Sequence, residues 1–325
     1  MPTPPTSRPP QRRLLTAALT TVAVLATVAV SACGGSADAG GTDAKLRIGY
    51  QRFGGLSLVK ARGAAPDVEW SLFESGPALT EALKAGSIDI GQVGEAPPVF
   101  AAAGRIPFSV IGTSAPIPQG EAVLVKADRG YRSFADLKGR TVALNKGSNV
   151  HWLLVRLLAA NHMTLKDIQV KYLKPAEGRP AFDGGQIDAW VIWDPYFALA
   201  EQPGVQVLAD ATGLASNREY VLAAPRALDK RTNEIRAFLQ RYREVTDWGI
   251  AHPGERASTL APELKIPQDV TSRALARSAK PLAPVTPAIG DELQAITDSF
   301  IALELIPGPV DLRSRVDGRF NEVFQ

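Results

Sequence analysis

Three small polar residues form the turn with the clearest binding chemistry in this chain of 325 residues. Residues 144–154 read LNKGSNVHWLL, in which Gly147, Ser148 and Asn149 precede an apolar stripe at helical spacing. Ser148 can cap that helix, and the first N–H groups of a helix lie at the positive end of its dipole, where anions bind. The pattern predicts either a cap alone or a cap that also binds an oxyanion. His151 in the first turn is either a contact or a histidine satisfied by a neighbour.

Further polar and aromatic side chains follow other predicted strands. Gln51 ends a predicted strand and either donates its amide to an oxyanion or is a plain turn residue. Trp190 and Trp193 lie three apart in a strand and therefore face opposite sides, so we expect Trp193, nearer the turn, to wall an apolar slot. Asp194, which a proline follows, is either a helix N-cap or a ligand contact.

The Glu95-Ala96-Pro97 turn follows a short apolar strand in the same way. A bare carboxylate repels an anion. Glu95 and Asp194 would therefore contact an anionic ligand only if their own charge is bound by the N-terminus of the following helix, or if the ligand carries an amine. Ligands of open α/β sheets lie beyond the carboxyl ends of the strands. We therefore expect these turns to converge on one cleft.

The residue patterns of common enzymes and metal sites are missing from the sequence. The chain has three histidines without an HExxH pair and a single cysteine, and no GxSxG, P-loop or GxGxxG motif follows a strand. We therefore predict that the protein is not an enzyme and uses neither a metal nor another cofactor.

The first 44 residues predict export and a lipid anchor. Residues 1–32 combine three arginines with a long apolar run and no acid, which is typical of a signal peptide, although the run is nearly long enough for an uncleaved anchor. The run ends in VSAC, which resembles the bacterial lipobox, so Cys33 is predicted to become the lipidated first residue. Residues 33–44 then form a flexible tether. We expect an extracytoplasmic protein anchored to the cell membrane.

The charge balance excludes one class of partner. Removal of residues 1–32 leaves 33 basic and 33 acidic residues, so the mature chain is formally neutral. It lacks the basic surface that nucleic-acid binding requires. We predict no nucleic-acid partner and a monomer.

The remaining chain alternates between predicted strands and helices. Strands are predicted at 45–50, 68–73 and 141–144. One helix is predicted at 56–62, between the first two strands, and another at 76–85, after the second strand. This alternation predicts parallel sheets with covered faces. Later segments, at 232–252 and 287–305, read as helices.

A weak internal repeat indicates two similar lobes. Residues 78–100 and 178–200 share the order helix, glycine, Gly-x-Ile-Asp, apolar strand, acid, proline and helix. Two segments near 118–122 and 217–221 each lead into an apolar strand and are expected to cross between the lobes. We predict a discontinuous first lobe of residues 45–121 and 223–325, a second lobe of residues 122–222, and a central cleft that closes by hinge motion.

Several motifs resemble the aliphatic-sulfonate-binding proteins of ABC importers, within the group that binds sulfonate, taurine and nitrate. The motifs are RIGYQ at 47–51, LVKARG at 58–63, EALKAGSIDIG at 81–91, EAPPVFA at 95–101, DLKGRTVALNKGSN at 136–149 and IDAWVIWDPY at 187–196. The resemblance leads us to expect Asp at the position of Glu95 in many relatives and a more polar turn in place of FGG at 53–55.

The resemblance implies a type II periplasmic-binding fold and a substrate-binding protein that delivers alkanesulfonates to a permease and ATPase complex. It places Gln51, the Glu95 turn, the Gly147 turn and residues 190–194 around the ligand. Other ligands of the group, namely taurine, nitrate or a thiamine pyrimidine precursor, and a sensory role are the alternatives. Because a sulfonate stays ionised and no histidine partner is required, we predict nearly flat binding from about pH 6 to 8.

Overall fold

The computed structural model describes residues 45–278 and 280–325. The predicted signal peptide, Cys33 and the tether lie outside these residues. Among the described helices, none combines the length and apolar character that a membrane span requires.

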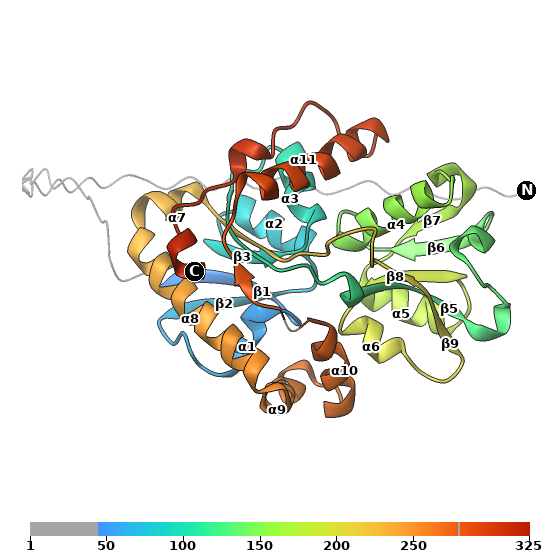
Figure 1. The fold of residues 1–325 in the computed structure, drawn as a ribbon, viewed down its shortest axis with the longest axis horizontal. Coiled ribbons are helices and arrows are strands. Elements are labelled where there is room, and N and C mark those ends of the chain that lie inside the picture. The colour runs from blue at the N-terminus through green and yellow to red at the C-terminus, as the bar shows by residue number, and fades with distance from the viewer. Residues whose placement is uncertain (1–44, 279) are drawn as a thin grey trace, which may run out of the picture. The chain divides into compact units, whose positions relative to one another are not determined.

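A mixed sheet of six strands forms the centre of the first lobe, in the order β11-β4-β10-β3-β1-β2 (Figure 1). Its strands are β1 (Leu46–Gln51), β2 (Val68–Phe73), β3 (Ile90–Val93), β4 (Ser109–Ser114), β10 (Tyr220–Ala223) and β11 (Leu282–Ala283). The helices are α1 (Gly55–Ala61), α2 (Gly76–Lys84), α3 (Ala96–Ala103), α7 (Pro225–Lys230), α8 (Thr232–Ala251), α9 (Pro253–Leu264), α10 (Gln268–Ser278) and α11 (Pro287–Ala302). Apolar residues of α1, α8 and α9 pack on one face and those of α2, α3 and α11 on the other, so both faces are covered.

The second lobe is built on a sheet of five strands, in the order β7-β6-β8-β5-β9. Its strands are β5 (Glu121–Lys126), β6 (Thr141–Leu144), β7 (Gln169–Tyr172), β8 (Ala189–Trp193) and β9 (Val205–Asp210). The helices are α4 (Asn149–Ala160), α5 (Pro175–Asp183) and α6 (Tyr196–Ala200). The apolar stripe of α4 packs on one face of this sheet, and α5 and α6 cover the other.

The expectation of parallel sheets is wrong for the edge strand β11, which runs antiparallel to β4, and for one inner strand of each lobe. Strand β10 runs antiparallel to β3 and β4, and β5 runs antiparallel to β8 and β9. Each of these strands follows directly on a segment that arrives from the other lobe, so it enters the sheet from the opposite end. A helix crossover within one lobe, which parallel pairing requires, is absent at these two places.

Two segments connect the lobes, at residues 115–120 between β4 and β5 and at 211–219 between β9 and β10. We call them the first and second crossing. They overlap the two segments that the sequence indicated. Strand β10 pairs in the first sheet although it begins at Tyr220, ahead of the expected boundary after residue 222. The exact division into lobes stays a proposal.

The internal repeat corresponds to the same three elements in each lobe. Residues 78–100 cover α2, β3 and α3, and residues 178–200 cover α5, β8 and α6. The aspartates of the two Gly-x-Ile-Asp motifs have the same role. Asp89 accepts a hydrogen bond from the backbone N–H of Arg47 at 3.0 Å, and Asp188 accepts one from Thr141 at 2.9 Å. Each aspartate therefore joins the start of its strand to the strand beside it.

Candidate functional site

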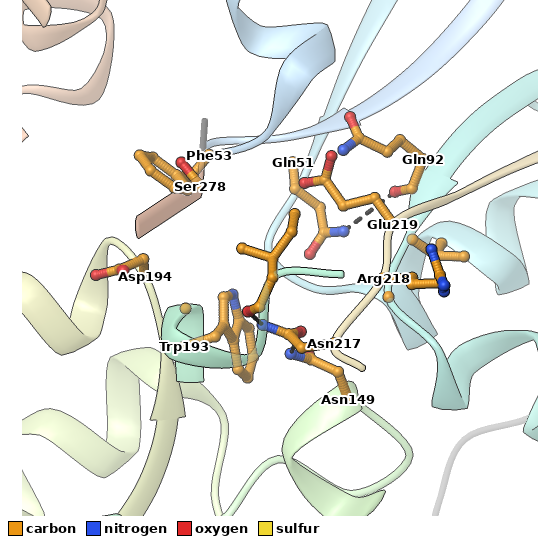
Figure 2. A pocket seen from close by; sticks show the side chains of 14 residues that line it. Gln51, Phe53, Gln92, Asn149, Trp193, Asp194, Asn217, Arg218, Glu219 and Ser278 are labelled. Carbon is orange, nitrogen blue, oxygen red and sulfur yellow. Dashed lines mark hydrogen bonds between the residues drawn. The ribbon is translucent and has the colours of Figure 1, made fainter. Parts of the chain in front are cut away.

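A cleft lies between the two sheets, and both lobes and both crossings contribute to its walls (Figure 2). We call it the interlobe cleft. It is lined by Gln51, Phe53, Gln92, Val93, Gly94, Ile117, Gly120, Asn149, Trp193, Asp194, Asn217, Arg218, Glu219 and Ser278. Four of the predicted binding residues are among them: Gln51, Asn149, Trp193 and Asp194. The other six are buried and do not line it: Glu95, Ala96, Pro97, Gly147, Ser148 and His151.

Two glutamine amides form the wall on the side of the first sheet. Gln51 ends β1, and its Nε2 donates to the backbone carbonyl of Gln92 at 3.1 Å. This bond turns the Oε1 of Gln51 into the cleft (Figure 2). The Oε1 of Gln92 in turn accepts from the N–H of Leu56 at the start of α1. The predicted amide of Gln51 is therefore at the cleft, and it presents an acceptor there.

The Gly54-Gly55 turn lets these side chains come close to the backbone. Gly54 has φ of +137°, and a Cβ there would lie 2.9 Å from Gln92 Nε2 and 3.1 Å from Glu219 Oε1. A Cβ on Gly55 would lie 2.5 Å from the hydroxyl of Tyr242. Glycine is required at the first position both for its backbone angle and for the space beside it.

The N-terminus of α4 begins with the predicted turn. Ser148 is the N-cap residue, yet its hydroxyl donates to the carbonyl of Asn145 at 2.8 Å and caps no helix N–H. Gly147, with φ of +76°, donates its N–H to His151 Nδ1 at 3.2 Å. Burial, with a smaller contribution from the charge of Lys146, lowers the pKa of His151 to about 4. His151 is thus a neutral, buried ring whose Nδ1 accepts from Gly147 and whose Nε2 has no hydrogen-bond partner among the described residues.

Asn149 links the second lobe to both crossings. Its Nδ2 donates to Glu121 Oε2 at 2.6 Å and to Asn217 Oδ1 at 2.8 Å. Asn217 donates its own amide to the carbonyl of Ile117 at 2.8 Å. The amide of Asn149 therefore binds the start of β5 and the second crossing, while its backbone opens helix α4 at the wall of the cleft.

Trp193 ends β8 and Asp194 follows it, near the turn that the sequence indicated. Trp190 is buried with 1 % of its surface exposed, whereas Trp193 lines the cleft (Figure 2). Asp194 accepts from the N–H of Ala198 in the first turn of α6. It also forms a two-pronged ion pair with Arg277 of α10, at 2.8 and 2.9 Å. Asp194 is therefore both a cap and a paired charge.

Glu95 is enclosed at the start of α3, where Asn217 of the second crossing faces it. Its carboxyl oxygens lack a hydrogen-bond partner among the described residues, although the backbone N–H of Asn217 faces them. Burial, and then the nearby carboxyls of Glu121 and Glu292, raise its pKa well above the ordinary value. Burial likewise raises the pKa of Glu121 to about 8, against the hydrogen bond from Asn149. These acids are held largely protonated inside the protein at neutral pH.

The second crossing supplies cleft residues that the sequence analysis did not single out as ligand contacts. Arg218 lines the cleft and pairs through Nε with Glu292 at 3.0 Å. Glu219 points its carboxyl toward Gln51 and Gln92 (Figure 2). Burial raises the pKa of Glu219 to about 7, opposed by the charge of Arg256 and the N–H of Gly55. The sequence signal that could have identified these cleft residues is the polar run at 217–219, which directly precedes the apolar strand β10.

The charged residues of the described chain form no metal site. Among residues 45–278 and 280–325, no group of three or more His, Cys, Asp or Glu side chains is arranged to hold an ion.

Comparison with known proteins gives close relatives over most of the chain. A family model described as the NMT1-like family matches residues 42–261. An aliphatic sulfonates-binding protein of Escherichia coli strain K12 is 36 % identical over 281 residues, which cover 83 % of this chain and 88 % of the relative.

Two solved structures have a similar fold. The alkanesulfonate-binding protein SsuA from Xanthomonas axonopodis pv. citri, bound to MOPS, has a TM-score of 0.81 at 34 % identity, over 84 % of this chain and 98 % of that chain. The crystal structure of the periplasmic aliphatic sulphonate binding protein SsuA from Escherichia coli has a TM-score of 0.77 at 35 % identity, over 84 % and 92 % of the two chains.

Proposed function

This chain belongs to the NMT1-like family, among its aliphatic-sulfonate-binding proteins, and we propose that it is the extracytoplasmic substrate-binding component of an ABC importer. The type II periplasmic-binding fold expected from the sequence motifs is confirmed. As a member of a binding-protein family, the chain carries ligand and catalyses no reaction on it.

One observation carries the proposal beyond family membership. The interlobe cleft takes its walls from both sheets and both crossings, so a ligand in it contacts parts of the protein that can move relative to one another. Binding there favours the arrangement in which the lobes are close, which is how hinge-bending receptors report that they are loaded. Hinge closure followed by delivery to a permease and ATPase is the mechanism we propose.

We place the sulfonate group at the N-terminus of α4. The N–H groups of Asn149 and Val150, the first two residues of this twelve-residue helix, bind no carbonyl of the described chain and lie at the positive end of the helix dipole. Asn149, the first helical residue, lines the cleft, but its side chain is engaged by Glu121 and Asn217. The backbone N–H groups are therefore the donors that we propose for the oxyanion. The hydroxyl of Ser148 donates to the carbonyl of Asn145 and so stabilises the turn.

We place the alkyl chain of the ligand against Trp193. This arrangement predicts that Trp193→Ala weakens the binding of hexane-1-sulfonate by about ten-fold or more and that of methanesulfonate far less, since each buried CH₂ contributes about 0.8 kcal/mol. Isothermal titration calorimetry on the parent and the variant measures both. Ser299→Ala, at a half-buried position of α11 that does not line the cleft, is the control.

The ligand class is tested by the same calorimetry. Alkanesulfonates should bind the parent protein, and taurine, nitrate and a thiamine pyrimidine precursor form the comparison set. Binding of nitrate or of the thiamine pyrimidine precursor, with no binding of any sulfonate, would replace the proposed ligand class. Equal loss of both sulfonates in Trp193→Ala would place the alkyl chain elsewhere.

We also propose a lipid anchor at Cys33 and a monomeric working state. The anchor rests on the VSAC segment and on a single cysteine in the whole chain, both outside the described residues. Cys33→Ser should move the exported protein from the membrane fraction to the soluble fraction with its sulfonate affinity retained. A variant that stays with membranes after signal cleavage would overturn the anchor.

A further inference from the structure

The ionisable side chains that line the interlobe cleft are paired, with one exception. Asp194 is paired with Arg277, and Arg218 with Glu292. Glu219 has no ion pair within 4.0 Å among the described residues, and Arg256, the cation that acts on it, lies beyond that distance. Among the described residues that line this cleft, one carboxyl therefore has no ion-pair partner, and the one cation, Arg218, is already paired.

The carboxyl of Glu219 is held in place by the surrounding backbone. Its Oε1 lies against Gly54, whose missing Cβ leaves room for it, and the N–H of Gly55 faces it. The Oε1 of Gln51 points into the same part of the cleft, because its Nε2 is bound to the carbonyl of Gln92 (Figure 2). Two acceptor groups therefore face one end of the cleft, at the wall of the first sheet.

We propose that this end of the cleft binds the ammonium group of an aminoalkanesulfonate, with Glu219 and Gln51 as its acceptors. The proposal rests on the proposed function, since it assumes that the sulfonate of the same ligand lies at α4. An ammonium group carries several N–H donors and needs acceptors around it. The preferred ligands are then zwitterions, and sulfonates with a plain alkyl tail are the weaker ones.

A second arrangement would use the same residues differently. A protonated Glu219 could donate to an oxyanion at this end, because burial raises its pKa to about 7. Gln51 argues against that arrangement, since an oxyanion beside its Oε1 would meet a second acceptor and be repelled. An ammonium group satisfies both side chains at once, and its charge favours the ionised carboxylate.

The test compares two ligands that differ in one terminal group. 3-Aminopropane-1-sulfonate and butane-1-sulfonate have the same chain length, with NH₃⁺ in one where the other has CH₃. Calorimetry on the purified protein at pH 8 should show binding about ten-fold or more tighter for the amino compound, since hydrogen bonds to charged groups contribute about 1.5 to 3 kcal/mol. In Glu219→Gln, which keeps the shape and removes the charge, the ratio of the two dissociation constants should fall to near one.

Control variants separate the cleft from general charge effects. Glu244→Gln removes one exposed carboxylate from α8 and should keep the parental ratio. If Glu219→Gln has a lowered melting temperature, Gln51→Met removes the other acceptor and should also reduce the ratio.

The outcomes distinguish this inference from the proposed function. Tight binding of both sulfonates with a parental ratio near one would overturn the ammonium site and leave the sulfonate function intact. A high ratio that persists in Glu219→Gln and in Gln51→Met would also overturn it. Failure of both ligands to bind the parent would remove the proposed function, and the inference with it.

Discussion

Glu219 changes the pH dependence that the sequence predicted. Without a titrating histidine, sulfonate binding was expected to be flat near neutrality. The structure supplies a cleft carboxyl whose burial raises its pKa to about 7. The groups that face this carboxyl are Arg256 on α9, the hydroxyl of Tyr242 on α8 and the N–H of Gly55. None of these changes charge between pH 6 and 8, so Glu219 itself determines the local change.

We therefore predict different pH responses for the two test ligands. As the pH rises from 6 to 8, Glu219 loses its proton, so the affinity for 3-aminopropane-1-sulfonate should rise, by up to about ten-fold across this window. The affinity for butane-1-sulfonate should fall or stay level, because an ionised carboxylate repels the sulfonate. Calorimetry at three pH values measures both. Glu219→Gln should flatten the response to the amino compound, and a slope that persists in this variant would assign the titration to the Glu95 and Glu121 pair.

Side-chain direction at the site could be predicted from the sequence only in part. Strand alternation separated Trp193 from Trp190, and the structure puts Trp193 at the cleft and Trp190 in the core. Local patterns say nothing about partners far away in the chain. Asp194 is paired with Arg277, 83 residues later, and Asn149 with Asn217, 68 residues later. These pairings decide which polar groups remain free for a ligand, and they arise only when the chain folds.

Strand and helix positions were largely predictable, because their periodicity is local. The strands at 68–73 and 141–144 have the predicted bounds, and the helices beginning near residues 56 and 76 lie where their spacing placed them. Strand direction was not predictable in the same way. Periodicity describes which faces of β5 and β10 are buried, and the long connections between the lobes decide which way these strands run.

The repeated aspartates predict two different losses of stability. Asp188 accepts from the N–H of Thr141 and from the hydroxyl of Tyr131, both at 2.9 Å. Asp89 accepts from the N–H of Arg47, and it pairs with three arginines: Arg47, Arg226 and Arg231. Asp188→Asn should lower the free energy of unfolding by about 1 to 2 kcal/mol, as expected for impaired hydrogen bonds. Asp89→Asn should cost more, about 2 to 3 kcal/mol, because the buried carboxylate also loses its charge pairing with three partly exposed arginines.

Urea unfolding followed by circular dichroism measures both changes. The slope of the free energy against urea should stay constant, so that the midpoint shift reports stability alone. Asp128→Asn, at an exposed position, is the matched control. Equal losses for the two aspartates would show that the arginines around Asp89 add nothing to the shared strand contact.

At the scale of the whole binding body, the lobes are joined by more than the two crossings. Helix α10 packs with α9 of the first lobe and contacts α6 of the second. Arg277 on this helix pairs with Asp194 at 2.8 Å and with Glu201 at 2.9 Å. The side chain of Asp194 is only 3 % exposed, so the pair is largely shielded from water on that side. The Arg277 contact therefore holds the lobes together across the mouth of the cleft, and we propose that it forms on closure.

Loss of this contact should shift the protein toward an open form. Arg277→Gln leaves Asp194 buried without its counter-charge, and breaking such a pair from one side costs about 3 to 5 kcal/mol when the structure cannot relax. Separation of the lobes relieves this cost, because it returns Asp194 to water. Small-angle scattering should then show a larger radius of gyration for the ligand-free variant than for the parent, and sulfonate affinity should fall because binding must first close the lobes. Both proteins have the same sequence outside position 277, so a difference between them reports the lobes. Saturating ligand should return the variant to the parental radius; equal radii without ligand, together with unchanged affinity, would show that Arg277 stabilises α10 locally and has no part in closure.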